Sequence, residues 1–254
     1  MVRRWPRPRT PVGASTRQCR SRRSIGAPGC ADRAPADAAT ATATANREPR
    51  TATDSASDGE EPHVDEQATK RAARRSAREA RDALDDETRA SAAARIRARL
   101  AALEEVRGAA TIVAYAATGS EVDLDPLLEV LLGRDVAVYL PVVDGPELTL
   151  ARVHDLTSDL AAGYRGVREP SPDLPRESAP AVDVVLVPGV GFAPDGTRIG
   201  YGGGHFDRLL TRLEAPTRIG VAYAAQVLPH LPTENHDQRL DAVVTETGVL
   251  RPSD

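Results

Sequence analysis

The stretch Val184–Arg208 reads VVLVPGVGFAPDGTRIGYGGGHFDR, and it determines how the rest of the chain is interpreted. It opens with an apolar, β-branched run that stops at Pro188, which is typical of a buried strand. Four glycines then fall within residues 200–204. The apolar residues that follow have helical spacing and are Phe206, Leu209, Leu210 and Leu213. The stretch therefore predicts a strand, a glycine-rich loop and a helix in direct succession.

This order of elements is suited to binding an anion. Glycines let successive backbone N–H groups turn toward one point, and the next helix adds free N-terminal donors and the positive end of its dipole. The loop is not a Walker A motif, because His205 and Phe206 follow Gly204 where Lys and Ser or Thr are required. It is also a poor dinucleotide fingerprint, since its third glycine falls one place short. A tight structural turn is the alternative, but the neighbouring Arg198 and Arg208 favour a phosphate site.

The composition excludes several classes of protein. The chain has 254 residues, which is enough for one large domain or two small ones. Its formal net charge is −4. No run of about 18 apolar residues occurs, so we expect no membrane span. Both cysteines, Cys19 and Cys30, lie near the N-terminus, which excludes a thiolate nucleophile, a Cys-ligated metal and a disulfide framework from the rest of the chain. The cytoplasm is the expected compartment.

Residues 1–66 differ in composition from the rest. They contain Pro, Arg, Ala, Thr, Gly and Ser with almost no large apolar residues, so they cannot bury enough surface to offset the entropy of ordering. We predict a disordered extension over 1–66 and a single α/β catalytic domain over 67–254. The first 35 residues are rich in Arg and nearly free of acid, which leaves a transit peptide or nonspecific nucleic-acid binding as alternatives to a functionless extension. Nucleic acid is not expected as a partner except through this basic tail.

From residue 67 onward, helical and strand patterns alternate. The predicted helices are a basic one containing residues 70–78, one from Asp85 and Asp86 to Gly108, one from Asp125 (its N-cap) to Gly133, and the one after the glycine loop. The predicted strands span residues 111–116, 135–140, 147–153, 181–187, 217–222 and 242–245. This alternation predicts a three-layer α/β/α fold with a mainly parallel sheet and helices on both faces. The strand at 147–153 is expected to form an edge hairpin around Asp144-Gly145-Pro146.

Two acids are candidates for a metal site. Asp207 lies in the first turn of the helix after the glycine loop, where it is either a charge partner of the helix N-terminus or a Mg²⁺ ligand for bound phosphates. Asp237 alone is interpreted as an ordinary loop acid, but Mg²⁺ needs a second hard oxygen ligand, so the two acids support each other. No zinc-type spacing of His, Cys and Asp and no G-x-S-x-G motif occurs.

Two further pairs of charged residues have both an ordinary and a functional interpretation. Lys70 and Arg74 are four residues apart on one helical face, which is either solvated or turned toward a ligand. Glu121 and Asp123 follow the first strand and are either helix caps or ligand contacts. The residue patterns alone leave these alternatives open.

Together these motifs resemble a known family. Val-Pro-Gly-Val-Gly-Phe (187–192), followed by residues 195–208, resembles the signature of the 5-formyltetrahydrofolate cyclo-ligases, also called 5,10-methenyltetrahydrofolate synthetases. Other segments resemble further motifs of that family, namely Lys70-x-x-x-Arg74, Glu121-Val122-Asp123, Gly166-Val-Arg-Glu169-Pro170, and a C-terminal block with Gln226, Pro229, Asp237, Asp241 and Thr245-Glu246. The similarity covers residues 67–249 in the right order and does not include the N-terminal extension.

The resemblance implies an ATP- and Mg²⁺-dependent enzyme that converts 5-formyltetrahydrofolate, a reduced folate, to 5,10-methenyltetrahydrofolate, ADP and phosphate. Phosphoryl transfer to the formyl oxygen would turn a poor leaving group into a good one, and N10 of the folate could then close the ring. Such a protein aligns its substrates and neutralises charge, and it needs no covalent nucleophile. We expect it to be a monomer.

The resemblance also implies roles for individual residues. The implied catalytic residues are Lys70, Arg74 and Arg198. The implied nucleotide-binding residues are Lys70, Arg71, Ala72, Ala73, Arg74, Arg198, Gly200, Tyr201, Gly202, Gly203, Gly204, His205, Phe206 and Arg208. The implied substrate contacts are Thr118, Glu121, Asp123, Tyr201 and His205. The implied Mg²⁺ ligands are Asp207 and Asp237.

Four positions depart from the family's pattern. His205, which precedes Phe206, stands where the family has the first of two aromatic residues, and Ala193 replaces an Asp. Leu124 replaces a Thr, and Ala73 replaces a larger apolar residue. Two other interpretations therefore remain: a sugar-phosphate or CoA-handling α/β enzyme that uses no ATP, and a non-catalytic protein that binds folate or nucleotide. The first of these predicts no paired Mg²⁺ acids and no need for Lys70.

Overall fold

The computed structural model describes residues 66–163, 167–234 and 236–252. The predicted disordered extension, apart from Glu66, lies outside the described residues. None of the helices in the described ranges combines the length and the apolar character that a membrane span requires.

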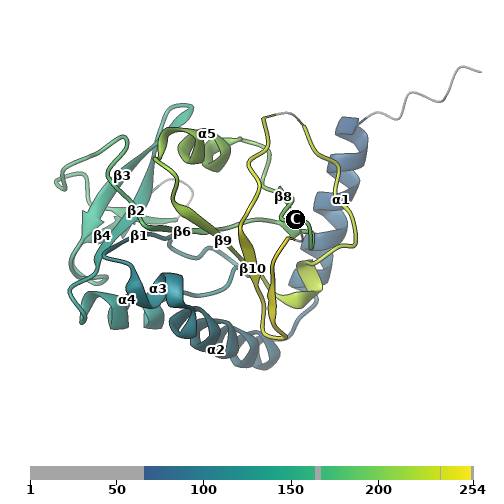
Figure 1. Cartoon of the computed structure of the whole chain (residues 1–254), viewed down its shortest axis with the longest axis horizontal. Coiled ribbons are helices and arrows are strands. Elements are labelled where there is room, and N and C mark those ends of the chain that lie inside the picture. The colour runs from purple at the N-terminus through teal and green to yellow at the C-terminus, as the bar shows by residue number, and fades with distance from the viewer. Residues whose placement is uncertain (1–65, 164–166, 235, 253–254) are drawn as a thin grey trace, which may run out of the picture. The chain divides into compact units, whose positions relative to one another are not determined.

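The described chain is built around one sheet of seven strands in the order β11-β10-β9-β6-β1-β2-β3 (Figure 1). These strands are β1 (Thr111–Val113), β2 (Ala137–Asp144), β3 (Glu147–Val153), β6 (Val184–Val187), β9 (Thr217–Val221), β10 (Ala242–Val244) and β11 (Val249–Leu250). The five inner strands run parallel, and β3 and β11 pair antiparallel at the two edges. The prediction of a mainly parallel sheet with an edge hairpin is therefore confirmed.

Two short hairpins lie outside this sheet. One joins β4 (Leu160–Ala162) to β5 (Arg168–Pro170), and the other joins β7 (Gly191–Phe192) to β8 (Arg198–Ile199). The second hairpin lies inside the stretch that was predicted as one glycine-rich loop, so part of that loop has regular structure.

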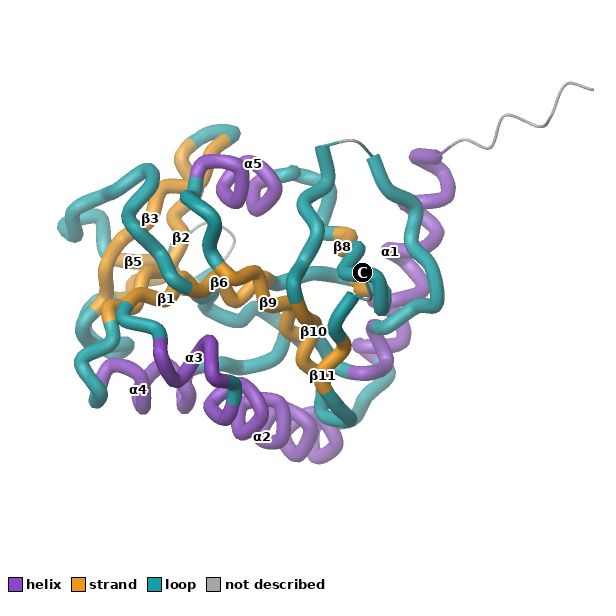
Figure 2. The backbone as a smooth tube through the Cα atoms, viewed as in Figure 1, coloured by secondary structure: helices purple, strands orange, loops and turns teal. Residues whose placement is uncertain are grey.

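Helices cover both faces of the sheet, as predicted (Figure 2). They are α1 (Glu66–Asp82), α2 (Asp86–Ala102), α3 (Glu104–Gly108), α4 (Asp125–Leu132), α5 (His205–Arg212) and the short 3₁₀ helix η2 (Ala224–Gln226). Helices α2, α3 and α4 lie on one face, and α5 lies on the other (Figures 1 and 2).

The apolar run of β6 serves both faces. Val184 and Leu186 pack in the core that contains the buried residues of α2, α3 and α4, whereas Val185 and Val187 pack in the core of α5. Successive side chains of a strand point to opposite faces, so a central parallel strand with helices on both sides needs a continuous apolar sequence. All four residues are buried, which explains why this is the most apolar strand of the chain.

Several predicted boundaries differ from the structure, and β1 (predicted over 111–116) and β6 (predicted over 181–187) are each three residues shorter than predicted. Three further differences have a structural reason. The predicted helix from Asp86 to Gly108 is two helices, because Leu103 has an extended backbone (φ −64°, ψ 136°) that ends α2 and precedes α3. Strand β2 does not end at Pro141 but continues to Asp144. Past the end of β1 it pairs only with β3, and a strand with one free edge tolerates a residue without an N–H donor.

The third difference concerns the start of α4. The helix includes Asp125, and its N-cap is Leu124, which makes no side-chain capping hydrogen bond. The prediction that Asp125 is the N-cap is therefore wrong by one residue. Its N–H instead donates a hydrogen bond to the carboxylate of Asp123, at 3.0 Å. At the start of α2, by contrast, Asp85 is the N-cap and accepts from the N–H of Thr88, as predicted.

Helix α1 belongs to neither helical layer and lies beside the β7–β8 hairpin and η2 (Figure 1). Its contact with β7 is tight, because a Cβ atom at Gly191 would come within 3.2 Å of the Cβ of the buried Ala77. Glycine at this position lets the helix approach closely. The basic face of α1 is thereby brought to the glycine loop.

Candidate active site

A cavity of about 670 Å³ lies at the carboxyl ends of β1 and β6. These strands are neighbours in the sheet, but the chain leaves them toward opposite edges, from β1 through α4 to β2 and from β6 through α5 to β9. In an open α/β sheet such a reversal leaves a crevice between the two diverging loops, and ligands bind there. The basic face of α1 and the segment before β10 complete the walls.

Most of the residues that the sequence selected line this cavity. They are Lys70, Arg71, Arg74, Thr118, Glu121, Arg198, Gly200, Tyr201, Gly202, Gly203, Gly204, His205, Phe206, Asp207, Arg208 and Asp237. They come from four segments that are far apart in the chain, so the fold brings together residues that the sequence could only name separately.

Three selected residues do not line the cavity: Ala72, Ala73 and Asp123. The side chain of Asp123 accepts from the N–H of Asp125, and its backbone carbonyl accepts from Arg97 at 2.8 Å. These contacts stabilise the start of α4 and correspond to the helix-end interpretation of Asp123 rather than to a ligand contact. Glu121, two residues earlier, points into the site instead.

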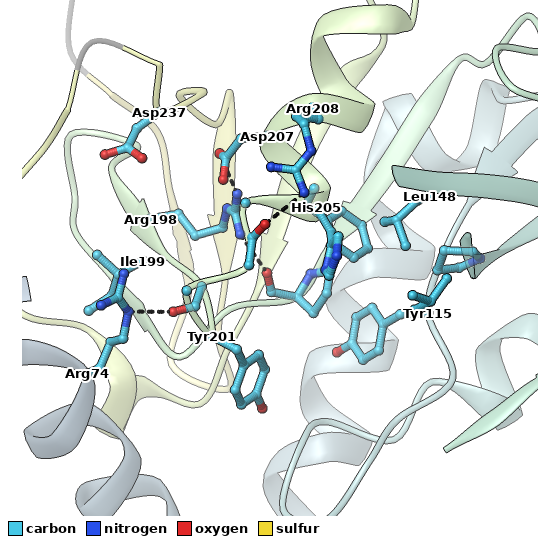
Figure 3. Close-up of a pocket in the computed structure, with 18 of the residues that line it drawn as sticks. Arg74, Tyr115, Leu148, Arg198, Ile199, Tyr201, His205, Asp207, Arg208 and Asp237 are labelled. Carbon is cyan, nitrogen blue, oxygen red and sulfur yellow. Dashed lines mark hydrogen bonds and ion pairs between the residues drawn. The ribbon is translucent and has the colours of Figure 1, made fainter. Parts of the chain in front are cut away.

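The glycine loop is held from two sides (Figure 3). Arg74 of α1 donates from Nε to the carbonyl of Gly200 at 2.8 Å, and Arg208 of α5 donates from Nη2 to the carbonyl of Gly203 at 2.8 Å. Gly204 has φ of 64° and is the N-cap of α5. Only glycine adopts this left-handed backbone without strain, which explains its presence at the turn into the helix.

The segment after β6 is also held in place by a buried side chain, that of Gln226. The buried side-chain amide of Gln226 donates to the carbonyls of Gly189 and Val190, at 3.1 and 2.9 Å. A buried amide that satisfies two backbone carbonyls fixes the path of the chain at the exit of the strand. Gln226 was noted in the sequence only as part of a motif, and this contact was not predicted.

Arg198 is buried (5% exposed) and forms an ion pair with Asp207 (Figure 3). The distance from its Nη2 to Oδ1 of Asp207 is 2.6 Å, and the N–H of Gln238 also donates to that oxygen at 3.3 Å. The Nε atom of Arg198 is buried without a hydrogen-bond partner among the described residues. A buried guanidinium beside a cavity, held by a carboxylate and with spare donors, is suited to binding a phosphate.

Lys70 is the second buried cation of the cavity wall (5% exposed). Its Nζ lies 2.6 Å from Oδ2 of Asp237 and 3.4 Å from Oε1 of Glu234. Burial alone would raise the pKa of Asp237, but the ammonium of Lys70 and the N–H of Glu234 outweigh that effect, so the pKa is lowered. Asp237 therefore carries its charge at neutral pH.

The acids of the cavity have the chemistry that a magnesium ion requires. Asp207 and Asp237 both line it, and ligand atoms of Glu234, His236 and Asp237 lie within 4.8 Å of one another. Carboxylate oxygens are the ligands that Mg²⁺ prefers. Arg198 occupies only Oδ1 of Asp207, and Lys70 occupies Oδ2 of Asp237. The donor set therefore fits Mg²⁺, although the sequence had selected neither Glu234 nor His236.

The opposite end of the cavity combines apolar and polar groups. The β2–β3 hairpin contributes Val143 and Leu148, and Tyr201 contributes an exposed ring. The hydroxyl of Tyr201 donates to Oε1 of Glu121 at 2.8 Å, and the N–H of Thr118 donates to Oε2 at 2.9 Å. The hairpin wall was not predicted, because its alternating pattern indicates an edge strand and does not indicate what its exposed face contacts.

The comparison with known proteins adds an independent observation. Residues 66–246 match the sequence model of the 5-formyltetrahydrofolate cyclo-ligase family. The chain belongs to that family. The match begins with α1 and ends just after β10, so it includes every segment that lines the cavity. The resemblance drawn from the sequence motifs is confirmed.

Relatives with the name 5-formyltetrahydrofolate cyclo-ligase agree with this membership. The protein from Escherichia coli strain K12 is 31% identical over 179 residues, which is 68% of this chain and 97% of that protein. The protein from Mycolicibacterium smegmatis is 36% identical over 141 residues, which is 53% of this chain and 73% of that protein.

Solved structures of 5,10-methenyltetrahydrofolate synthetases share the fold. The NMR structure of the Aquifex aeolicus protein superimposes with a TM-score of 0.66 at 35% identity, covering 73% of this chain and 93% of that one. The Mycoplasma pneumoniae protein has a TM-score of 0.57 at 24% identity, covering 70% and 98%, and supports the fold alone. The predicted α/β fold is confirmed, and membership of the cyclo-ligase family sets aside a sugar-phosphate or CoA-handling enzyme.

Proposed function

We propose that this chain catalyses the ATP- and Mg²⁺-dependent cyclisation of 5-formyltetrahydrofolate to 5,10-methenyltetrahydrofolate, with release of ADP and phosphate. The observation that carries the proposal is the composition of the cavity at the ends of β1 and β6. One part of it has a glycine loop, buried cations and oxygen donors, and the other part has apolar and aromatic walls with a carboxylate. Membership of the cyclo-ligase family supports the same reaction.

The described residues that line the cavity include no Cys and no Ser, and the proposed chemistry needs no covalent nucleophile. When ATP is bound, its γ-phosphoryl group goes to the formyl oxygen, N10 of the folate forms the new C–N bond, and phosphate leaves with that oxygen while N10 loses its proton. The protein's task is to align the formyl oxygen with the phosphate and to neutralise charge.

The cations of the cavity have distinct positions for that task. Lys70 and Arg198 are buried and rigidly paired to Asp237 and Asp207, so they present charge at fixed points without reorganisation. Arg74 is half-buried and shapes the glycine loop through Gly200. We propose that Lys70, Arg198 and the loop N–H groups hold the phosphates, and that Asp207 and Asp237 hold Mg²⁺.

The other end of the cavity suits the ring systems of a reduced folate. Among the described residues, three large apolar side chains are exposed, and two of them, Val143 and Tyr201, line this cavity. Exposed apolar and aromatic groups beside a carboxylate suit a flat ring that carries N–H donors. A volume of about 670 Å³ is within the range of small-molecule sites.

A direct assay tests the proposal. Purified protein is mixed with 5-formyltetrahydrofolate and MgATP, and formation of methenyltetrahydrofolate is followed by its absorbance. We expect turnover that disappears when ATP is omitted and when EDTA removes Mg²⁺, and that returns when excess Mg²⁺ is added. Well-folded protein that gives no ATP-dependent signal would sink the proposal, and folate binding without turnover would support a non-catalytic binding protein instead.

A further inference from the structure

Arg81, near the end of α1, is the most buried arginine of that helix. It is 3% exposed, whereas Arg71, Arg75 and Arg78 on the same helix are exposed. Arg81 does not line the cavity. A buried guanidinium costs free energy unless its charge is compensated and its donors are used. Its partners therefore indicate what it does.

Those partners form a chain of polar groups that ends in the cavity. Nη1 of Arg81 donates to the hydroxyl of Tyr201 at 3.1 Å, and that hydroxyl donates to Oε1 of Glu121 at 2.8 Å. The other oxygen of Glu121 accepts from the N–H of Thr118 at 2.9 Å. The neighbouring Asp82 is half-exposed and lies at the long distance of 3.5 Å from Nε of Arg81. The main counter-charge is therefore Glu121, reached through Tyr201.

The hydrogen bonds that link Arg81, Tyr201 and Glu121 are all donated in the same direction. Burial and the Glu121 carboxylate raise the pKa of Tyr201, so its hydroxyl keeps the proton that it donates. A hydroxyl that accepts from a cation and donates to an anion is polarised in both bonds, which strengthens them.

Packing does not hold the Tyr201 ring in place, because the residue is 55% exposed. Its neighbours on both sides are glycines, and Gly202 has φ of 105°. Such a backbone has wide conformational freedom, so the hydroxyl contacts must fix the ring. Arg74 and Arg81 are seven residues apart and lie on one face of α1, where they hold the loop at Gly200 and at Tyr201.

We propose that Arg81 is a positioning residue for the folate end of the cavity. It sets the Tyr201 ring and the Glu121 carboxylate in the arrangement that binds the flat, N–H-bearing ring of the substrate, without touching the substrate itself. The inference rests on the proposed function, and it predicts a defect confined to folate binding. The phosphate end, formed by Lys70, Arg198 and the acids, uses none of these contacts.

The test compares Arg81→Met with Arg75→Met, which changes an exposed arginine of the same helix that does not line the cavity. We expect Arg81→Met to raise the KM for 5-formyltetrahydrofolate about tenfold, which corresponds to loss of about 1.4 kcal/mol and is the size of one hydrogen bond to a charged group. The KM for ATP should stay at the wild-type value. Calorimetric titration with 5-formyltetrahydrofolate in the absence of ATP should show the same weakening without relying on turnover.

A double-mutant cycle tests whether Arg81 acts through the hydroxyl. In a Tyr201→Phe background, Arg81→Met should have little further effect on folate affinity, because the link is already absent. Arg81→Lys keeps the charge but loses the fork of donors, so it should give an intermediate affinity. If Arg81→Met does not fold, Arg81→Lys in both Tyr201 backgrounds provides the same cycle.

Three outcomes would overturn the inference. One is a folate KM in Arg81→Met equal to that of Arg75→Met, which would leave Arg81 a purely structural role. Another is an equal rise in the KM for folate and for ATP. The third is full additivity of the Arg81 and Tyr201 substitutions. An inactive wild-type protein would instead contradict the proposed function, so the two failures are distinguishable.

Discussion

Individual residues of the cavity are already paired with opposite charges. Asp207 had two interpretations from sequence, as a charge partner of the helix N-terminus and as a Mg²⁺ ligand, and the structure adds a third role as the ion partner of buried Arg198. Asp237 has the same relation to Lys70. Each carboxylate pairs with a buried cation and is also a proposed ligand of the metal ion. Substitution of either carboxylate should therefore disturb metal binding and phosphate binding together.

Asp207→Asn tests the proposed metal ligand. The amide keeps an oxygen near Arg198 but removes the charge that Mg²⁺ requires, so the Mg²⁺ concentration for half-maximal activity should rise about 10- to 100-fold. The measurement is a Mg²⁺ titration of turnover. Asp173→Asn, at an exposed position outside the cavity, is the control. Full activity at limiting Mg²⁺ would remove Asp207 from the metal site.

Lys70→Ala tests the proposed phosphate contact. Removing a buried cation also leaves Asp237 without its partner, so we expect both weaker ATP binding and a lower melting temperature. The KM for ATP should rise about tenfold or more, while the KM for folate changes little. Steady-state kinetics with each substrate varied in turn measures both values. An unchanged KM for ATP would refute this role.

At the scale of elements, α5 fastens the β2–β3 hairpin that forms a wall of the cavity. Arg208 donates from Nε to the carbonyl of Pro146 at 3.1 Å, and Arg212 donates to the carbonyl of Leu148 at 2.6 Å. Both arginines also pair with Glu147. The helix that begins at the glycine loop therefore sets the position of the apolar wall as well.

Arg212→Met should loosen this hairpin without touching the cavity, since Arg212 does not line it. Loss of hydrogen bonds from a charged donor should speed amide hydrogen exchange in residues 142–149 about tenfold, and it should raise the KM for folate by a smaller factor. Arg107→Met, at an exposed position in α3, is the matched control. Unchanged exchange in the hairpin would show that α5 does not restrain it.

At the scale of the molecule, the site lies where the connections that follow two neighbouring parallel strands, β1 and β6, diverge. Helix α1, which lies outside the two helical layers (Figure 1), contributes another wall of the cavity. The described residues that line the cavity all lie within residues 67–237, and the family match begins at residue 66. Among the described residues, the segments that form the site therefore begin with α1.

Removal of residues 1–60 should therefore leave the activity intact. We expect kcat and both KM values within about twofold of the full chain, and a melting temperature that differs by only a few degrees, because α1 and its contacts are kept. Turnover and thermal unfolding of the two proteins measure this. A large loss of activity would show that the first 60 residues contribute to the site.

Local patterns were sufficient for much of the fold. The apolar runs of β6 and β9, the glycines before α5 and the cap at Asp85 are features of neighbouring residues, and their periodicity and turn chemistry predicted the elements correctly. The predicted boundaries were wrong where pairing with a residue distant in the sequence determines the end of an element. Strand β2 passes through Pro141 because β3 pairs with it there, and nothing near Pro141 in the sequence indicates that partner.

The sequence by itself determined the glycine loop, its helix and the chemical character of the site, because backbone freedom, charge and polarity are properties of the residues themselves. Only the tertiary structure decided the pairings. Lys70 meets Asp237 across 167 positions, and Arg81 reaches Tyr201 across 120. These contacts depend on the positions of the loops that follow the strands and on the close packing of α1 at Gly191. Neither can be inferred from the local sequence.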